Sequence, residues 1–202
     1  GPSRSGKSTL ENLLTKSSQL YPFYESISLE VLFSESRDKN NLDKIMFEEL
    51  FCQSEGGLLR QNYELITSTF PENVFYSDYL MDMLPNTYFV IIKRDAQDLA
   101  SEIFTHEYVQ GNFHTYDPNE IGKYLSIYSK ICDILALKVP DRCITITFEE
   151  IIESSADTVE RIGQLISQEF KVIHLKQNTM NIAPESLFRD NFAEIAKGLI
   201  FD

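Results

Sequence analysis

The sequence predicts an α/β fold of three layers, in which helices cover both faces of a central parallel sheet. Apolar runs rich in β-branched and aromatic residues alternate along the chain with segments whose apolar residues recur at helical spacing. The run 88–92 has five consecutive apolar residues, which is typical of a strand buried on both faces. Such alternation builds a sheet whose ligands bind at the carboxyl ends of the strands.

The chain opens with a phosphate-binding loop. Residues 1–8 fit the pattern Gly-x-x-x-x-Gly-Lys-Ser. Glycines let the backbone wrap around an anion so that successive N–H groups converge on it, and the helix that follows adds its positive end. Lys7 supplies a point charge and Ser8 a hydroxyl. The pattern therefore predicts a phosphate-bearing ligand, the alternative being a glycine turn that only caps the helix.

A loop of this type normally follows a buried strand, and no strand precedes Gly1. We therefore expect residues 1–202 to be one P-loop-type domain, truncated at its N-terminus, whose first strand lies outside this sequence.

The remaining elements follow from periodicity and turn signals. We expect a helix over 8–19, followed by a segment over 23–30 in which apolar and polar residues loosely alternate. A charged loop over 35–41, a helix over 42–50 and a shorter helix near 63–67 come next. We then expect a strand at 74–76, a helix at 81–84, a strand at 88–92 with a helix behind it, a loop at 111–118, a helix at 119–137, a strand at 143–148 and a helix over 155–166.

Composition limits the classes of function. The 202 residues are 43% hydrophobic and 24% charged, as in an ordinary globular domain. A formal net charge of −13 argues against a nucleic-acid partner. No apolar run approaches the roughly 18 residues of a membrane span and no signal peptide is visible, so we expect a cytoplasmic protein. The three cysteines and three histidines lack metal-site spacing, and we expect the cysteines to be reduced thiols.

A nucleotide kinase or NTPase is one candidate function. It needs a magnesium-binding aspartate at the end of a second strand. Asp78 follows a short, interrupted apolar run, and Asp95 follows a strong strand but comes directly after two cations. The kinase interpretation therefore rests on the loop alone.

Four segments, taken together, are more specific. They are SRSGKSTLENLL (3–14), LPNTYFVIIKRDAQD (84–98), YDPNEIGKYLSIY (116–128) and PDRCITITFEEI (140–151). In this order they resemble the landmarks of the sulfotransferases over residues 3 to 166, with the greatest similarity to bacterial tetratricopeptide-linked and tyrosylprotein-type members. The resemblance implies transfer of a sulfuryl group from 3′-phosphoadenosine-5′-phosphosulfate (PAPS) to a hydroxyl or amine, with no metal required.

The resemblance also implies roles for individual residues. Arg4 matches the cation of the family's loop, Arg94 the residue that holds the 3′-phosphate, and Glu25 the position of the catalytic base of tyrosylprotein-type members. The predicted donor-binding residues are Arg4, Ser5, Gly6, Lys7, Ser8, Thr9, Arg94, Ser101 and Phe148. The predicted catalytic residues are Glu25, Arg4 and Lys7.

The chain departs from the family pattern at several positions. Lys7 stands where members have threonine, and Thr69 stands where they have the lysine of Lys-x-Pro-x-Asn, so Lys7 is a candidate for the missing cation. Ser101 lies one residue too close to Arg94, which leaves Glu102 at the expected place of a 3′-phosphate serine. Phe148 replaces a tyrosine. A catalytically inactive nucleotide-binding domain is therefore a third interpretation, and the sequence identifies neither the acceptor nor the oligomeric state.

Overall fold

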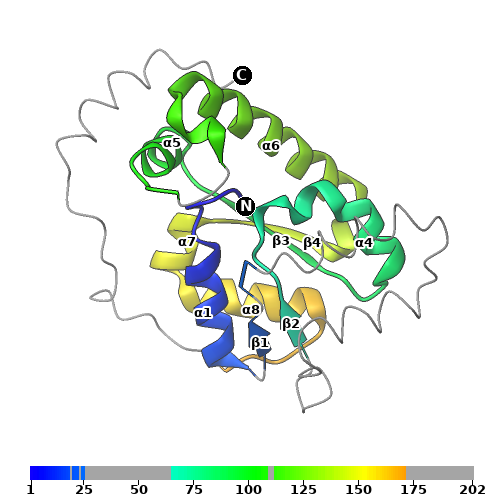
Figure 1. The fold of residues 1–202 in the computed structure, drawn as a ribbon. Helices are drawn as coiled ribbons and strands as arrows, with labels where there is room; N and C mark the ends of the chain where they lie inside the picture. Colours follow the sequence, from blue (N-terminus) through cyan, green and yellow to red (C-terminus); the bar gives the residue numbers. More distant parts are fainter. Residues whose placement is uncertain (19, 23, 26–64, 109–111, 172–202) are drawn as a thin grey trace.

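The computed structural model describes residues 1–18, 20–22, 24–25, 65–108 and 112–171. They form a mixed α/β protein with parallel strand pairs (Figure 1). Its elements are α1 (Lys7–Ser17), β1 (Leu20–Pro22), β2 (Leu65–Thr67), η2 (Pro71–Tyr76), α4 (Ser77–Met83), β3 (Phe89–Lys93), α5 (Ala96–Phe104), η3 (Phe113–Tyr116), α6 (Pro118–Lys138), η4 (Pro140–Arg142), β4 (Cys143–Thr147), α7 (Phe148–Glu153) and α8 (Ser155–Ile166).

All strand pairing in the described residues is parallel. β1 pairs with β2, and β3 pairs with β4 in a register that runs from Phe89 opposite Cys143 to Lys93 opposite Thr147. A parallel pair needs a crossover connection, which α5 and α6 supply between β3 and β4. The carboxyl ends of β3 and β4 therefore lie at one edge, as the α/β interpretation requires.

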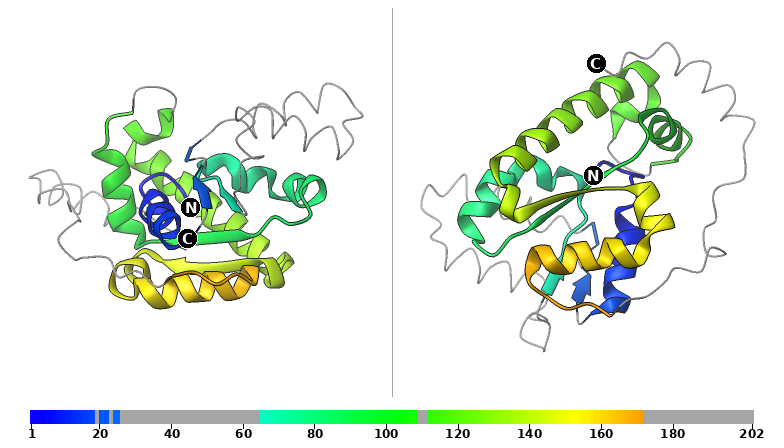
Figure 2. Two further views of the ribbon diagram at one scale, coloured as in Figure 1. Left: turned by 90° about the horizontal axis from the view of Figure 1, so that it is seen from below. Right: turned by 180° about the vertical axis from the view of Figure 1, so that it is seen from behind.

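Both faces of β3 are buried, which explains its uninterrupted apolar sequence. Ile92 packs with Ile146 of β4 against apolar side chains of α1 and α8. Ile91 points to the opposite face and packs with Tyr128 of α6. Successive residues of a strand point to opposite faces, so one run serves two layers. Figure 2 shows β3 and β4 running between α6 and α8, which confirms the predicted helix–sheet–helix arrangement.

Three local predictions were wrong. Residues 74–76 belong to the 3₁₀ helix η2, which Pro71 begins and in which Phe75 is 45% exposed. The helix expected near 63–67 is instead strand β2, whose partner β1 lies far away in the sequence. The strand expected to reach Phe148 ends at Thr147, because Thr147 and Glu150 form a capping box that begins α7.

Several expectations fall outside the described residues, among them the loop at 35–41 and the helix at 42–50. Cys132 and Cys143 are free thiols, as expected. None of the helices in the described ranges has the length and hydropathy of a membrane span.

Candidate functional site

The loop that precedes α1 contacts the ends of the central strands. A Cβ atom added to Gly1 would stand 2.8 Å from the carbonyl oxygen of Ile92, the penultimate residue of β3. Gly6 has a φ of 101° and lies against the ring of Phe148, where a Cβ would overlap the ring. Only glycine satisfies both conditions at position 6. The predicted loop is therefore placed at the carboxyl end of β3, as inferred for a phosphate site.

The amino-terminal end of α1 has no side-chain cap. Gly6 is its N-cap and supplies no side-chain hydrogen bond. The first N–H groups of a helix have no partner within it and carry the positive end of the helix dipole. The backbone from Gly6 to Thr9 therefore offers the N–H groups that a phosphate or phosphosulfate needs.

The Lys7 side chain contacts both the backbone of the loop and the carboxylate of Glu25. Its Nζ donates to the carbonyl oxygen of Pro2 at 2.8 Å and lies 3.4 Å from Oε1 of Glu25. The lysine side chain is 7% exposed and the glutamate side chain 53%. Burial lowers the pKa of Lys7, and the Glu25 carboxylate partly opposes that change. The structure thus brings two of the predicted catalytic residues together.

Thr69 lies on the neighbouring segment. Its backbone N–H donates to the carbonyl oxygen of Tyr24 at 2.8 Å, so residue 69 runs directly beside the segment that carries Glu25. Lys7 therefore contacts Glu25 itself, and residue 69, the expected place of a lysine, is bonded to the residue before Glu25.

Glu11 is a residue of this region that sequence analysis missed. It is 2% exposed, one helical turn beyond Lys7, and its Oε1 accepts hydrogen bonds from Oγ1 of Thr67 at 2.5 Å and from the backbone of Tyr24 at 3.3 Å. Burial raises the pKa of its carboxyl group. The only signal in the sequence was an acidic residue among the apolar positions of the first helix. Glu11 joins α1 to β2 and to the residue before Glu25.

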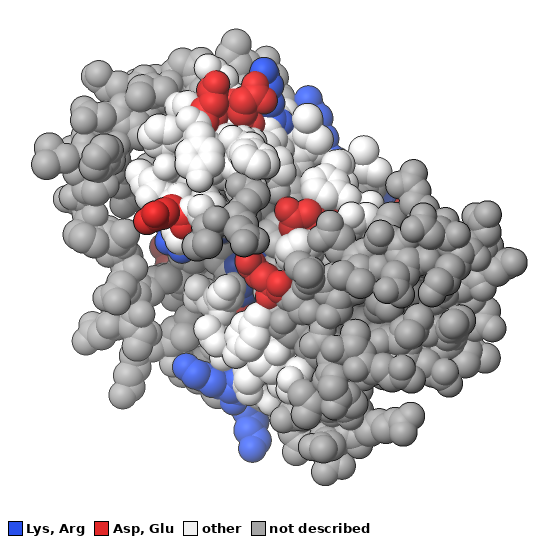
Figure 3. All heavy atoms as spheres, viewed as in Figure 1, with Lys and Arg blue, Asp and Glu red and all other residues white. Residues whose placement is uncertain are grey.

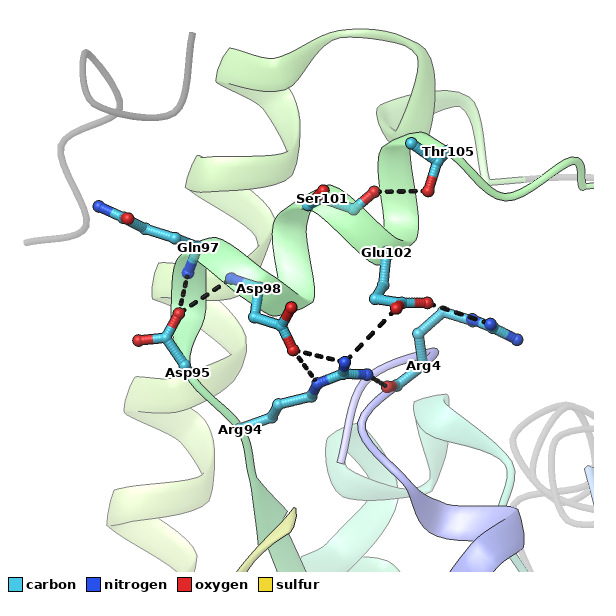
Figure 4. A network of polar contacts seen from close by, with 8 residues as sticks. All are labelled: Arg4, Arg94, Asp95, Gln97, Asp98, Ser101, Glu102 and Thr105. Carbon is cyan, nitrogen blue, oxygen red and sulfur yellow. Dashed lines mark hydrogen bonds and ion pairs between the residues drawn. The ribbon is translucent and has the colours of Figure 1, made fainter. Parts of the chain in front are cut away.

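Arg94 lies directly after β3 and contacts both the phosphate loop and α5 (Figure 4). Its Nη1 donates to the carbonyl oxygen of Arg4 at 2.9 Å, and its Nε donates to Oδ2 of Asp98 at 2.6 Å. The guanidinium also lies 4.5 Å from the ring centroid of Phe148, the same ring that packs on Gly6. Arg94 is therefore bound to the backbone of the phosphate loop, although 90 residues separate it from Arg4.

Glu102 completes this group of charges. Its Oε2 lies 3.1 Å from Nη2 of Arg4, and its Oε1 lies 3.5 Å from Nη2 of Arg94. Ser101, which was expected to contribute, is buried in α5, and its backbone carbonyl accepts from Thr105. Figure 4 shows Glu102 pointing toward the two arginines from α5.

Aromatic residues border the loop on another side. The Tyr108 hydroxyl donates to Oγ of Ser3 at 3.0 Å, and His106 packs edge-on against Tyr108 at 4.7 Å. Burial, with a further contribution from Arg4, lowers the pKa of His106. His114 instead stacks on Tyr124 of α6 at 4.1 Å, a packing role.

Charge around the site is mixed. On the face seen in Figure 3, acidic side chains of the described residues stand between the basic ones, so no continuous basic surface forms there. The described part of the chain also contains no group of three or more His, Cys, Asp or Glu side chains placed to hold a metal ion.

The parallel fold and the glycine loop at the end of β3 define an α/β protein of the phosphate-loop class. Comparison with known families then assigns it: the family described as the sulfotransferase family matches residues 1–171. The chain belongs to the sulfotransferase family, whose members transfer sulfuryl groups, and the kinase interpretation is set aside.

A solved structure supports the same fold. The crystal structure of a sulfotransferase from Alicyclobacillus acidocaldarius aligns with a TM-score of 0.59 at 15% sequence identity, covering 96% of this chain and 88% of that one. No curated protein shows significant sequence similarity to the chain.

Proposed function

We propose that this sulfotransferase uses PAPS as its donor and transfers the sulfuryl group to a hydroxyl or amine. One observation carries the proposal: Arg94 at the end of β3 hydrogen-bonds to the backbone of the phosphate loop at Arg4. This bond would hold a cation for one phosphate group and a loop for another in a fixed relation. A nucleotide with phosphate groups at both its 3′ and 5′ positions matches such a pair of sites.

The loop would bind the 5′-phosphosulfate. The N–H groups of residues 6–9 and the positive end of α1 are held in place by the fold, so they would stabilise developing charge without reorganisation. Arg94, with Arg4 beside it, would bind the 3′-phosphate. The Phe148 ring lies between Gly6 and Arg94 and so would flank the nucleotide between its two anionic ends.

Glu25 would act as the base. The acceptor oxygen or nitrogen attacks sulfur while the bond from sulfur to the bridging oxygen of the 5′-phosphate breaks. The acceptor proton passes to the Glu25 carboxylate, and adenosine 3′,5′-bisphosphate leaves. Half of the Glu25 side chain is exposed, so an acceptor can reach it.

Lys7 would have two effects in this scheme. Its ammonium group would pair with the Glu25 carboxylate in the free enzyme, and it would stabilise the charge that develops on the leaving oxygen. The approach of Thr69 to the Glu25 segment supports the hypothesis that Lys7 replaces the family's lysine at position 69.

The test is nucleotide binding without magnesium. We expect adenosine 3′,5′-bisphosphate to raise the melting temperature, because a ligand that binds only the folded state stabilises it by mass action. Arg94→Ala should abolish the effect. Arg142→Ala is the matched control, since Arg142 also donates to a backbone carbonyl, that of Pro85 at 2.9 Å, but lies at the opposite end of the strands.

The other outcomes separate the alternatives. Stabilisation by ATP that increases with magnesium, without stabilisation by the bisphosphate, would refute the proposed donor. Binding of the bisphosphate with no turnover of PAPS toward any hydroxyl or amine acceptor would indicate an inactive nucleotide-binding member of the family.

A further inference from the structure

Glu102 lies between Arg4 and Arg94, the two cations proposed above for the 3′-phosphate. One carboxylate oxygen faces Arg4 and the other faces Arg94, at 3.1 and 3.5 Å. The Glu102 side chain is 16% exposed and that of Arg94 is 10% exposed, so this contact is shielded from solvent more than an ordinary surface ion pair.

The charges of the group cancel. Arg4 and Arg94 are positive, and Asp98 and Glu102 are the carboxylates that contact them. A phosphate monoester carries about −1.5 to −2 at neutral pH. A phosphate that approached Arg94 while Glu102 stayed in place would meet a like charge in a partly buried setting, where repulsion is stronger than in bulk water.

The two carboxylates are held differently. Asp98 lies in the first turn of α5 and contacts Nε and Nη2 of Arg94, four residues before it, which orients the guanidinium. Glu102 reaches across to Arg4, whose side chain is 42% exposed, and its longer contact to Arg94 measures 3.5 Å. Glu102 is therefore the carboxylate that can move away while Asp98, the Arg4 carbonyl and the Phe148 ring continue to hold Arg94.

We propose that Glu102 is an internal competitor of the nucleotide's 3′-phosphate for Arg4 and Arg94, and that it determines how strongly the site selects for that phosphate. The inference rests on the proposed use of a 3′-phosphorylated donor. Binding of the donor replaces the Glu102 carboxylate with the 3′-phosphate on the two guanidinium groups, and the displaced side chain turns to solvent.

The test combines a change in the protein with a change in the ligand. Dissociation constants are measured by titration calorimetry for adenosine 3′,5′-bisphosphate and for adenosine 5′-phosphate, on the wild type and on Glu102→Gln. Glutamine keeps the shape but loses the charge. We expect the bisphosphate to bind about tenfold more tightly to the variant, the scale of one hydrogen bond to a charged group. Binding of the monophosphate should change by less than about twofold.

Two further variants guard the interpretation. Glu107→Gln removes one negative charge just after α5 from a residue that makes no ion pair with Arg4 or Arg94 among the described residues, and it should leave both constants unchanged. Glu102→Ser removes the carboxylate differently, so the test stands even where Glu102→Gln folds poorly. Melting curves without nucleotide establish that each variant is folded.

Each outcome separates this inference from the donor proposal. Tighter binding of the bisphosphate alone supports the inference, including a case in which only the variants bind it. Equal or weaker binding of the bisphosphate to both Glu102 variants overturns the inference and leaves the donor proposal standing, provided the wild type binds. No binding of the bisphosphate to wild type or variants overturns both. An equal gain for both nucleotides also overturns the inference.

Discussion

Lys7 and Glu25 form an ion pair at 3.4 Å in which the cation is buried and the carboxylate is half exposed. The buried partner is held by a second bond, from Nζ to the carbonyl oxygen of Pro2. The exposed partner is the one that an acceptor would reach under the proposed function. A buried cation beside an accessible carboxylate suits the base proposed above.

Lys7→Ala should lower turnover far more than donor affinity. The ammonium group is expected to act mainly on charge that develops in the transition state, and loss of one such donor costs about 100-fold in kcat. Steady-state kinetics at saturating PAPS and calorimetry with adenosine 3′,5′-bisphosphate measure the two effects separately. Lys16→Ala, an exposed lysine on the same helix, is the control. An unchanged kcat in Lys7→Ala would refute the hypothesis.

Glu25→Gln should remove the base while leaving the nucleotide bound. We expect kcat to fall by about 100-fold or more, which is typical for loss of a general base, with little change in nucleotide affinity. If Lys7 and Glu25 act as a unit, the double variant Lys7→Ala/Glu25→Gln should be no slower than the slower single variant. Multiplication of the two effects would indicate independent roles.

Glu11→Gln should be more stable than the wild type, by a difference that grows as the pH rises. Burial raises the pKa of Glu11 in the folded protein above its unfolded value of 4.5. The folded state therefore binds more protons in the interval between the two values, and wild-type stability from this group is lost as pH rises through the folded pKa. Glutamine keeps an oxygen for Thr67 and the Tyr24 N–H without that loss.

Melting temperatures of wild type and Glu11→Gln from pH 4.5 to pH 8 measure this effect. The exposed Glu169→Gln is the control for removal of one carboxylate. A difference between wild type and Glu11→Gln that stays constant over the range, or that reverses, would contradict the argument.

Gly6→Ala should destabilise the protein and weaken nucleotide binding. A side chain at a φ of 101° is strained, and its Cβ would overlap the Phe148 ring. We expect a loss of about 2 kcal/mol in the free energy of unfolding, of which the backbone contributes about 1–2. Denaturant unfolding measures it. The double variant Gly6→Ala/Phe148→Ala removes the overlap and is compared with Phe148→Ala alone. Equal stability of these two variants would show that the backbone conformation at position 6 is not the cause.

The predicted fold and loop were recoverable because they depend on local patterns. The apolar run of β3 and the long periodic helix α6 were located to within one residue at each end. By contrast, β1 and β2 are three residues long and exist through their pairing with each other, so no local periodicity indicates them. The end of β4 was decided by a helix cap rather than by apolar character.

The sequence by itself determined the glycine loop, the strand that ends just before Arg94 and the resemblance to the sulfotransferases, because each depends on neighbouring residues. Only the tertiary structure decided which carboxylates meet which cations. Glu25 meets Lys7, and Glu102 bridges Arg4 and Arg94, although the partners lie far apart in the sequence. Contacts between residues 98 positions apart depend on how helices pack, and a one-dimensional pattern does not carry that information.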